Sequence, residues 1–218
     1  MSTGLELDTR SKLLKAGVTV FSKVGYVGAS VRQIADLAGV NHGSIRYHYE
    51  SKGDLWRACI IYLSGLMEAA VHQDEARWAA MEPRERIINV TAHFIRFNAK
   101  YPEMHRIMAF ETVYESERLD WLNENFIRPF TARAMASVAL AQEQGVYPDN
   151  IPVLNQHYIN VAAATSIFMV APEIQKNFGV DVFDEREVER HIDAVLSVLL
   201  GVPVSRGKDD FNNMLSTK

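Results

Sequence analysis

The residue types that are scarce in the chain exclude several classes of protein. Its 218 residues include a single cysteine, Cys59, so no disulfide can form within the chain, and the composition fits a reducing cytoplasm. A lone thiol has no thiolate partner for a zinc site, and we interpret Cys59 as a small core residue. Glycine and proline number only 12 and 7, which favours helices over turn-rich β structure.

Targeting signals, membrane segments and catalytic motifs are also lacking. Residues 1–11 are polar, which argues against a signal peptide. The longest uncharged stretch, residues 151–172, has a proline near each end and carries four polar side chains: Asn155, Gln156, His157 and Asn160. We therefore expect a buried helix there, and a cytoplasmic protein without a membrane span. The chain has no glycine-rich phosphate loop, no H-E-x-x-H and no nucleophile elbow, so we expect no enzyme, no metal and no cofactor.

The charges of the chain are distributed unevenly. The formal net charge is −4, which argues against general coating of nucleic acid. Residues 1–56, however, hold seven of the 23 Lys and Arg against five of the 27 Asp and Glu, a balance of +2, and the remainder is acidic. A basic end on an acidic body suits a small DNA-binding domain, because phosphate neutralisation supplies most of the affinity for DNA.

The spacing of apolar residues predicts an all-helical protein of about nine helices. Apolar side chains recur every three or four residues and show no sustained strand-like alternation. The first helix is expected over about residues 9–24, ended by Gly25. Longer helices are expected in the rest of the chain, near residues 53–78, 83–99, 102–114, 117–144, 152–176 and 185–201. Pro129 should kink or split the segment that contains it.

Residues 30–52 carry the strongest local pattern. Ser30 and Gln33 fit a capping box at the start of a second helix, whose inner face includes Leu37, and Gly39 suits a left-handed residue at its end. Asn41 can cap a third, short helix that ends at His48. Two short capped helices joined by a tight turn indicate a helix-turn-helix, whose second helix would lie in the major groove of DNA. The alternative is an ordinary helical hairpin with solvated polar residues.

Arg46 is the residue expected to read a guanine, because its planar guanidinium matches the O6 and N7 acceptors of that base. Arg32 is the next candidate, for a base or a phosphate. The other candidates for DNA contact are Ser30, Gln33, Asn41, His42, Gly43, Ser44, Tyr47, His48 and Lys52. Tyr47 and His48 could equally be packing residues, and Ser30, Tyr47, His48 and Lys52 suit phosphates better than bases.

This stretch resembles the DNA-binding region of TetR-type (tetracycline-repressor-like) regulators. The resemblance covers about residues 9–60 and rests on Gly25-Tyr26, Ser30-Val31-Arg32-Gln33-Ile34-Ala35, Ala38-Gly39-Val40, Gly43-Ser44-Ile45, Tyr47-His48-Tyr49 and Ser51-Lys52. Arg46 stands where many members have tyrosine, which favours a guanine-dependent operator. Tyr49 replaces a frequent phenylalanine. The resemblance implies double-stranded operator DNA as partner, repression as the usual mode, and a homodimer built mainly from the last two helices of the chain.

We expect three regions: a DNA-binding domain at 1–52, a ligand-binding and dimerisation domain at 53–201, and a tail at 202–218. An apolar stripe on the last helix is a candidate dimer interface: Val188, Ile192, Val195, Leu196 and Leu199. Small residues of the preceding helix, Ala162 and Ser166 among them, would let another helix approach closely. Both features could instead be core within one chain.

The resemblance also implies a pocket for a small-molecule effector in the second domain. Its middle helices are rich in aromatic and methionine side chains, which can line an apolar pocket. Candidate ligand-binding residues are His93, Phe97, Met104, Met108, Phe110, Trp121, Asn160, Thr165, Phe168 and Met169. Each could also be an ordinary core residue. The rival interpretation is a helix-turn-helix protein that binds DNA but senses no ligand.

Overall fold

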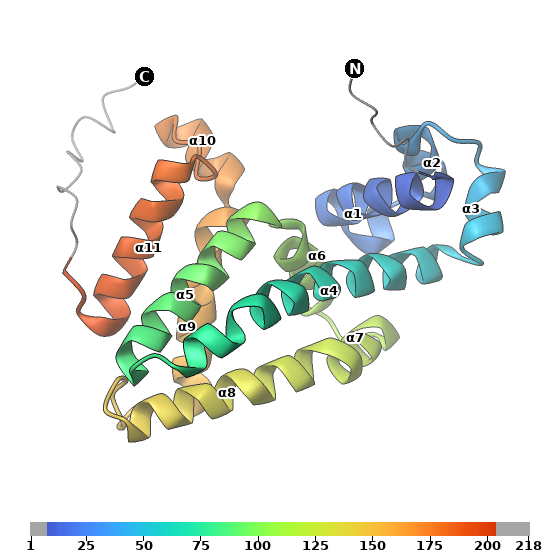
Figure 1. The fold of residues 1–218 in the computed structure, drawn as a ribbon. Coiled ribbons are helices and arrows are strands. Elements are labelled where there is room, and N and C mark those ends of the chain that lie inside the picture. The colour runs from blue at the N-terminus through green and yellow to red at the C-terminus, as the bar shows by residue number, and fades with distance from the viewer. Residues whose placement is uncertain (1–7, 204–218) are drawn as a thin grey trace, which may run out of the picture. The chain divides into compact units, whose positions relative to one another are not determined.

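All elements that the structure describes are helices (Figure 1). The structure is a computed structural model and describes residues 8–203. The helices are α1 (Thr9–Gly28), α2 (Val31–Ala38), α3 (Gly43–His48), α4 (Lys52–Ala79), α5 (Pro83–Lys100), α6 (Glu103–Glu111), α7 (Glu117–Leu122), the π-helix η1 (Asn123–Ile127), α8 (Arg128–Glu143), α9 (Val153–Met169), α10 (Ala171–Phe178) and α11 (Glu185–Leu200). The all-helical prediction is confirmed. The expected tail lies outside the described residues from 204 onward.

Two of the expected long helices are interrupted near prolines, which raises the number of helices in residues 8–203 above nine. In the segment 117–144, a π-helical turn precedes Pro129, and the amide of Arg128 donates to the carbonyl of Asn123, five residues earlier. Pro129 has no amide hydrogen and its ring clashes with the preceding turn, so the regular bonding pattern cannot run through it. The segment 152–176 is broken at Val170, just before Pro172 in the first turn of α10.

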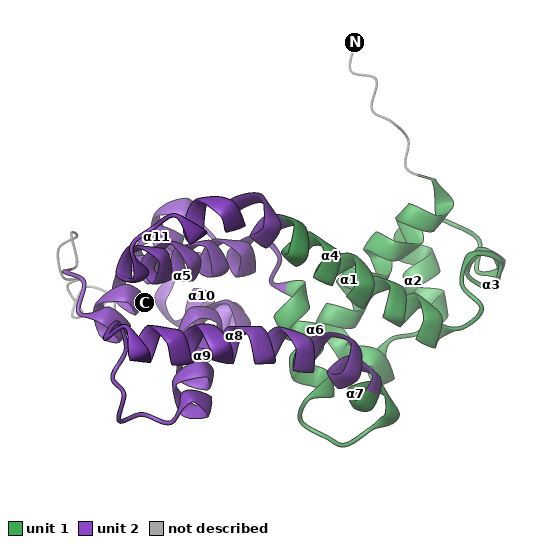
Figure 2. Cartoon of the chain, turned by 60° about the horizontal axis from the view of Figure 1, so that its bottom comes forward, with its two compact units in different colours: residues 1–69, 103–120 green, residues 70–102, 121–218 purple. Residues whose placement is uncertain are grey.

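The described chain forms two compact units (Figure 2). Unit 1 comprises residues 8–69 and 103–120, and unit 2 comprises residues 70–102 and 121–203. The sequence pattern placed a boundary after residue 52, whereas α4 continues from unit 1 into unit 2 without a break. Unit 1 also includes α6, which is distant in sequence from α1 but packs along it.

Unit 1 has a core built from α1 to α4. Its fully buried side chains include Leu13, Phe21, Ile34, Ile45, Leu55 and Trp56. Helices α1 and α4 approach each other closely at Gly17, where an added Cβ atom would lie 2.9 Å from Sγ of Cys59. Cys59 itself is fully buried, as expected, and burial raises the pKa of its thiol. The packing of α1 against α4 supports α2 and α3, which contact α1.

Unit 2 has a separate core, to which α5, α8, α9 and α11 contribute. Its buried members include Ile95, Val138, Ala164, Phe168, Ile192 and Val195. In the described part of the chain, no helix is both long enough and apolar enough to cross a membrane. The uncharged stretch 151–172 contains α9 and the first two residues of α10, and α9 contributes Ala164 and Phe168 to this core.

Candidate DNA-binding interface

The first helix of the helix-turn-helix, α2, begins with the expected cap. The Ser30 hydroxyl oxygen accepts a hydrogen bond from the Gln33 amide at 3.1 Å. This bond satisfies one of the amides that a helix start leaves unpaired. Arg32 and Gln33 are exposed on this helix, while Ile34 and Ala35 are buried. Leu37, expected on the inner face, is instead 55% exposed.

The turn between α2 and α3 depends on Gly39. Its φ of 66° and ψ of 34° place it in the left-handed region, where a Cβ atom would be strained. The Gly39 amide donates to the carbonyl of Asp36, and the Val40 amide donates to that of Ala35. These two bonds form the Schellman arrangement that closes a helix end. The turn predicted from Ala38-Gly39-Val40 is therefore confirmed.

Helix α3 buries one side chain and leaves the others at least partly accessible. Asn41 Oδ1 accepts from the amide of Gly43, the first residue of α3, at 2.8 Å, but the residue at the cap position is His42, whose side chain makes no capping bond. Ile45 is 1% exposed and anchors the helix to unit 1, whereas Tyr47 on the outer face is 85% exposed. The exposed residues of the helix and of the two positions before it are Asn41, His42, Gly43, Arg46 and Tyr47, and Ser44 and His48 are half-buried. The candidate contact residues of this helix thus keep accessible surface, Ser44 and His48 less than the others, whereas Ile45 is buried.

Asp36 is part of this surface and was missed by the sequence reasoning. One of its carboxylate oxygens lies 2.9 Å from Nε2 of His42, and the other lies 3.8 Å from Nε of Arg32. It therefore links the turn residue His42 to α2. The four-residue spacing of Arg32 and Asp36 was the signal that could have revealed it.

Lys52, expected to hold a phosphate, makes contacts inside unit 1. Its Nζ atom donates to the carbonyls of Tyr26 and Ala29, both at 2.9 Å. The same atom lies 4.3 Å from the centroid of the Tyr26 ring. Lys52 thereby joins the end of α1 to the start of α4. Whether its remaining donor contacts a phosphate stays a prediction.

The start of α4 is held by a reciprocal pair. The Ser51 hydroxyl donates to the Asp54 carboxylate at 2.6 Å and accepts from the Asp54 amide at 3.1 Å. The hydrogen bond from Ser51 holds the pKa of the Asp54 carboxyl below its usual value. The capping arrangement expected at Ser51 is therefore confirmed, and it sets where α4 begins after the helix-turn-helix.

The ten candidate ligand-binding residues are divided between the two units. Met104, Met108 and Phe110 belong to α6 in unit 1, and the other seven belong to unit 2. Asn160 is held in a hydrogen-bond network, since it accepts from Gln156 at 2.8 Å and donates to the Tyr147 hydroxyl at 3.2 Å. The Thr165 hydroxyl donates to the carbonyl of Val161 at 2.8 Å. Neither group is therefore a spare polar anchor.

The remaining candidates in unit 2 differ in burial. Phe97 and Phe168 are 6% and 2% exposed and pack against Tyr101 and Phe183, respectively. Trp121 is half-buried beside Phe126, and Met169 is 40% exposed. The structure thus places part of the expected aromatic cluster in the core and part at the surface.

His93 lies in a polar cluster on α4 and α5. Its Nδ1 atom is 3.5 Å from a carboxylate oxygen of Asp74, and its ring packs edge-on against Trp78 with centroids 5.0 Å apart. Burial lowers the pKa of His93, although the Asp74 carboxylate opposes this shift. Nε2 of His93 and Nε1 of Trp78 are both buried without a hydrogen-bond partner. Such atoms carry a cost that a bound ligand could remove.

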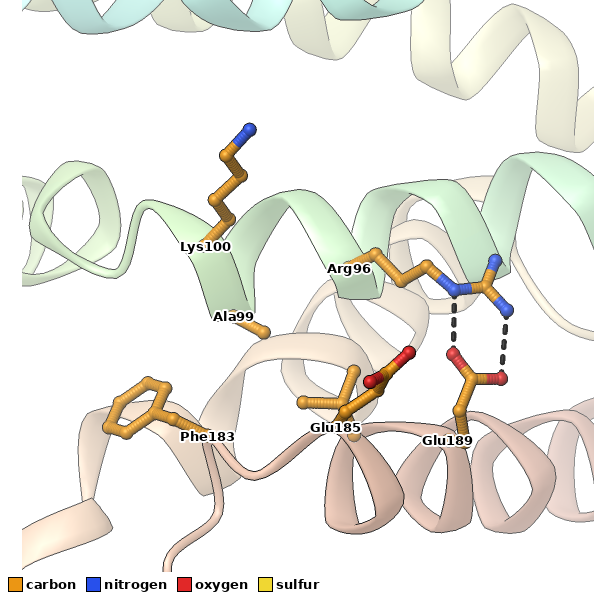
Figure 3. Close-up of a pocket in the computed structure, with 7 residues that line it drawn as sticks. Arg96, Ala99, Lys100, Phe183, Glu185 and Glu189 are labelled. Carbon is orange, nitrogen blue, oxygen red and sulfur yellow. Dashed lines mark hydrogen bonds and ion pairs between the residues drawn. The ribbon is translucent and has the colours of Figure 1, made fainter. Parts of the chain in front are cut away.

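A separate groove of about 260 Å³ lies between α5 and the segment that leads into α11 (Figure 3). Arg96 spans part of it through two hydrogen bonds to Glu189, at 2.7 and 2.8 Å, and Figure 3 shows the side chain of Lys100 pointing away from the groove. The other lining residues are Ala99, Phe183, Glu185 and Val188. None of the ten candidate ligand-binding residues lines it. No group of side chains that could hold a metal ion occurs among residues 8–203.

The expected dimer stripe on α11 is mostly buried within unit 2. Val188, Ile192, Val195 and Leu196 are between 3% and 7% exposed and belong to its core, and Leu199 packs against that core. The stripe therefore faces inward in the single chain, because α5 and α9 pack against it. Ala162 and Ser166 of α9 are exposed. The apolar side chains that remain exposed on these two helices include Leu154, Tyr158, Ile159 and Val198.

A capped helix-turn-helix with an exposed second helix, followed by a larger helical unit, defines the class of a one-component transcription regulator. Residues 13–59 match the model of the bacterial regulatory proteins of the tetR family. The match covers the whole helix-turn-helix and its packing partners in α1 and α4. The chain therefore carries the DNA-binding domain of the TetR family of transcriptional regulators, a family that acts by binding DNA and not by catalysis.

Relatives resemble the chain over most of its length. The HTH-type transcriptional repressor NicS of Pseudomonas putida is 27% identical over 185 residues, which cover 82% of this chain and 84% of the relative. The repressor SCO4008 of Streptomyces coelicolor is 25% identical and matches 77% of this chain and 82% of its own. Both similarities extend beyond the DNA-binding region into unit 2.

Solved structures share the fold at low sequence identity. AibR in complex with isovaleryl coenzyme A and operator DNA superposes with a TM-score of 0.70 at 16% identity, covering 88% of this chain and 98% of that one. The fatty acid degradation regulator FadR from Bacillus halodurans gives a TM-score of 0.61 at 15% identity, covering 88% and 97%. These similarities support the all-helical architecture.

Proposed function

We propose that this regulator is a repressor that binds a palindromic operator as a homodimer and leaves it when unit 2 binds a small, mostly apolar ligand. The observation that carries the DNA-binding part is the exposed face of α3, where Arg46 and Tyr47 stand outward from a helix anchored by Ile45. A major groove admits one such helix. Repression requires only that the bound protein occlude a promoter.

The sensing role is favoured over a protein that only binds DNA by the polar atoms buried in unit 2. Trp78 Nε1, His93 Nε2, Asn98 Oδ1 and His191 Nε2 are buried and have no hydrogen-bond partner. An unsatisfied buried polar group costs about 1–3 kcal/mol. A ligand that supplies hydrogen-bonding atoms to Trp78 and His93 would offset part of this cost. The fold shared with AibR, whose structure holds isovaleryl coenzyme A and operator DNA, supports acyl compounds as a first class to test.

The experiment for DNA binding is selection of duplexes from a random library with the purified protein, followed by sequencing. Enrichment of a palindrome with two half-sites about one helical turn apart, or a multiple of that, is expected for a dimer. Without any enriched sequence, the proposed repressor function fails.

The experiment for sensing is a thermal-shift screen with short-chain acyl coenzyme A thioesters, free fatty acids and aromatic acids. A ligand that binds the native protein must raise its melting temperature. A hit is then titrated by calorimetry with and without operator. By linkage, operator must weaken ligand binding by the factor by which ligand weakens operator binding, typically 5- to 150-fold. If a ligand binds free and DNA-bound protein equally well, the release mechanism is wrong.

A further inference from the structure

The segment 103–120 belongs to unit 1, although the chain on both sides of it belongs to unit 2. Its helix α6 lies along α1, and the two helices are in contact at the kink of α1. There Gly25 has a φ of 68°, and a Cβ atom on it would lie 3.0 Å from two ring atoms of Phe110. The Phe110 ring thus packs on bare backbone at the residue before Tyr26. Phe110, a candidate for the ligand pocket, takes part in this contact.

A partly buried ion pair joins the end of α6 to α7 within this segment. Glu111, the last residue of α6, is 4% exposed, and its carboxylate accepts a hydrogen bond from Nε of Arg118 at 2.8 Å. A buried carboxylate without such a partner would be costly, so the pair constrains both side chains. Glu111 thereby fixes where the Arg118 guanidinium lies.

Arg118 and Lys52 contact the same aromatic ring. The guanidinium carbon of Arg118 lies 4.3 Å from the centroid of the Tyr26 ring, and Nζ of Lys52 lies at the same distance. Both distances are within the range of a cation–π interaction. Tyr26 therefore joins the segment 103–120 to Lys52.

Lys52 carries the connection to both ends of the helix-turn-helix. It is the first residue of α4, four residues beyond the end of α3. It also donates to the carbonyl of Ala29, which precedes the Ser30 cap of α2. A displacement of the Tyr26 ring would therefore move Lys52, and with it the start of α2 and the residues that follow α3. Through these contacts, Arg118 and Glu111 can affect the helix-turn-helix without contacting DNA themselves.

We propose that Arg118, oriented by Glu111, is a positioning residue that fixes the helix-turn-helix for operator binding through Tyr26 and Lys52. The segment 103–120 then sets the affinity for DNA from within unit 1. This inference rests on the proposed operator binding. The two can be tested separately, because selection of an operator with the wild-type protein comes first.

The test compares Arg118→Met with Arg118→Lys. Methionine keeps a long apolar side chain but removes the charge, whereas lysine keeps a cation that can face both Glu111 and Tyr26. Dissociation constants are measured by fluorescence anisotropy for the selected operator and for a random duplex, at several salt concentrations. Arg128→Met, an exposed arginine of α8 in unit 2, is the matched control. We expect Arg118→Met to weaken operator binding about tenfold and random binding less, with Arg118→Lys and Arg128→Met near wild type.

The salt dependence separates positioning from direct contact. Because a homodimer carries two copies of each substitution, loss of a phosphate contact made by Arg118 would lower the slope of log K against log salt by about 1.8. An unchanged slope with weaker operator binding supports the proposal. A slope reduced by this amount, or an Arg118→Met protein that folds and binds operator as well as wild type, overturns it.

A second pair of variants keeps the test decisive if Arg118→Met does not fold. Tyr26→Leu removes the ring, and Tyr26→Phe keeps it. We expect only Tyr26→Leu to weaken operator binding and to speed hydrogen exchange of the amides in residues 30–50. In addition, Glu111→Gln combined with Arg118→Met should weaken binding less than the two separate effects predict together, since coupled residues are not additive. Equal binding by Tyr26→Leu and Tyr26→Phe would also overturn the proposal.

Discussion

Arg46 and Lys52 differ in what surrounds them, and their substitutions should therefore differ in effect. Arg46 is exposed on the outer face of α3, so its guanidinium is available to a base edge. Lys52 is half-buried and donates to two backbone carbonyls. The sequence pattern placed both in the DNA-binding region, but only the structure distinguishes a side chain that points outward from one that joins two helices.

Arg46→Ala should cost about 1–3 kcal/mol on the operator and relax the preference at one base pair in each half-site. The reason is the loss of a bidentate contact with guanine. Lys52→Ala is the matched comparison and should also weaken the operator more than random DNA, because it disturbs the joint between α1 and α4, but it should leave the preference at each base pair unchanged. Binding titrations with the operator, with single-base variants of it and with a random duplex measure this difference. If Arg46→Ala loses equally on both, it is a phosphate contact and not a reader of sequence.

His105 should make the protein less stable in mild acid. Burial lowers its pKa from 6.5 to about 4, so the folded chain favours the neutral ring. The unfolded chain then binds more protons between these two values, and stability is full above about pH 6.5 and falls as the pH drops towards 4. The fall is at most about 1.4 kcal/mol per pH unit for one histidine.

Urea unfolding of wild type and His105→Gln between pH 7.5 and 4.5 measures this effect. Burial also lowers the pKa of His93, His157 and His191, so part of the slope will remain in the variant. His72→Gln is the control, because the His72 side chain is 88% exposed. Equal slopes for wild type and His105→Gln would contradict the expected role of His105.

Among the helices, the residues that cap the helix ends were predictable from the sequence, whereas the helix interruptions were only partly predictable. Ser30, Gly39 and Ser51 each act within four residues of sequence, so local chemistry identifies them. Pro129 predicted that the helix would be interrupted. It did not predict a π-helical turn, because the form of the interruption depends on how the neighbouring turns pack. The inward orientation of the α11 stripe depends on α5 and α9, which are distant in sequence. Local periodicity shows that such a face is apolar but not what covers it.

Substitution of Gly39 and of Gly65 by alanine should change the stability of the protein in opposite directions. Around both Gly39 and Gly65, an added Cβ atom would meet nothing within 4 Å, so sterics with neighbours play no part. Gly39 has a φ of 66°, and alanine there should cost about 1–2 kcal/mol. Gly65 lies within the helix α4 and is exposed, and alanine there should stabilise by roughly 0.5–1 kcal/mol. Thermal unfolding of the two variants checks both signs, and a stable Gly39→Ala protein would show that the turn relaxes.

The whole molecule must supply two copies of α3 to read a palindrome. One six-residue helix contacts a single half-site, and a dimer that holds two such helices one DNA turn apart gains affinity without new contacts in either half. The stripe first considered for this interface is occupied by the core of unit 2. The side chains left exposed on α9 and α11 are therefore the surface through which we propose that two copies meet.

Substitution of that exposed surface should separate dimer formation from folding. Ile159 is 47% exposed on α9, and Val198 is 82% exposed on α11. Glutamate at both positions would place charges in an apolar interface while leaving the core of each chain intact. We expect Ile159→Glu with Val198→Glu to sediment as a monomer, to melt cooperatively, and to lose affinity for the full operator far more than for a half-site. Leu140→Glu is the control, because Leu140 is 40% exposed on α8, outside this surface. A double variant that keeps the mass of the wild-type dimer would mean that the two copies meet elsewhere, and Leu196→Glu could not settle the question because Leu196 is 5% exposed and its substitution would disrupt the core itself.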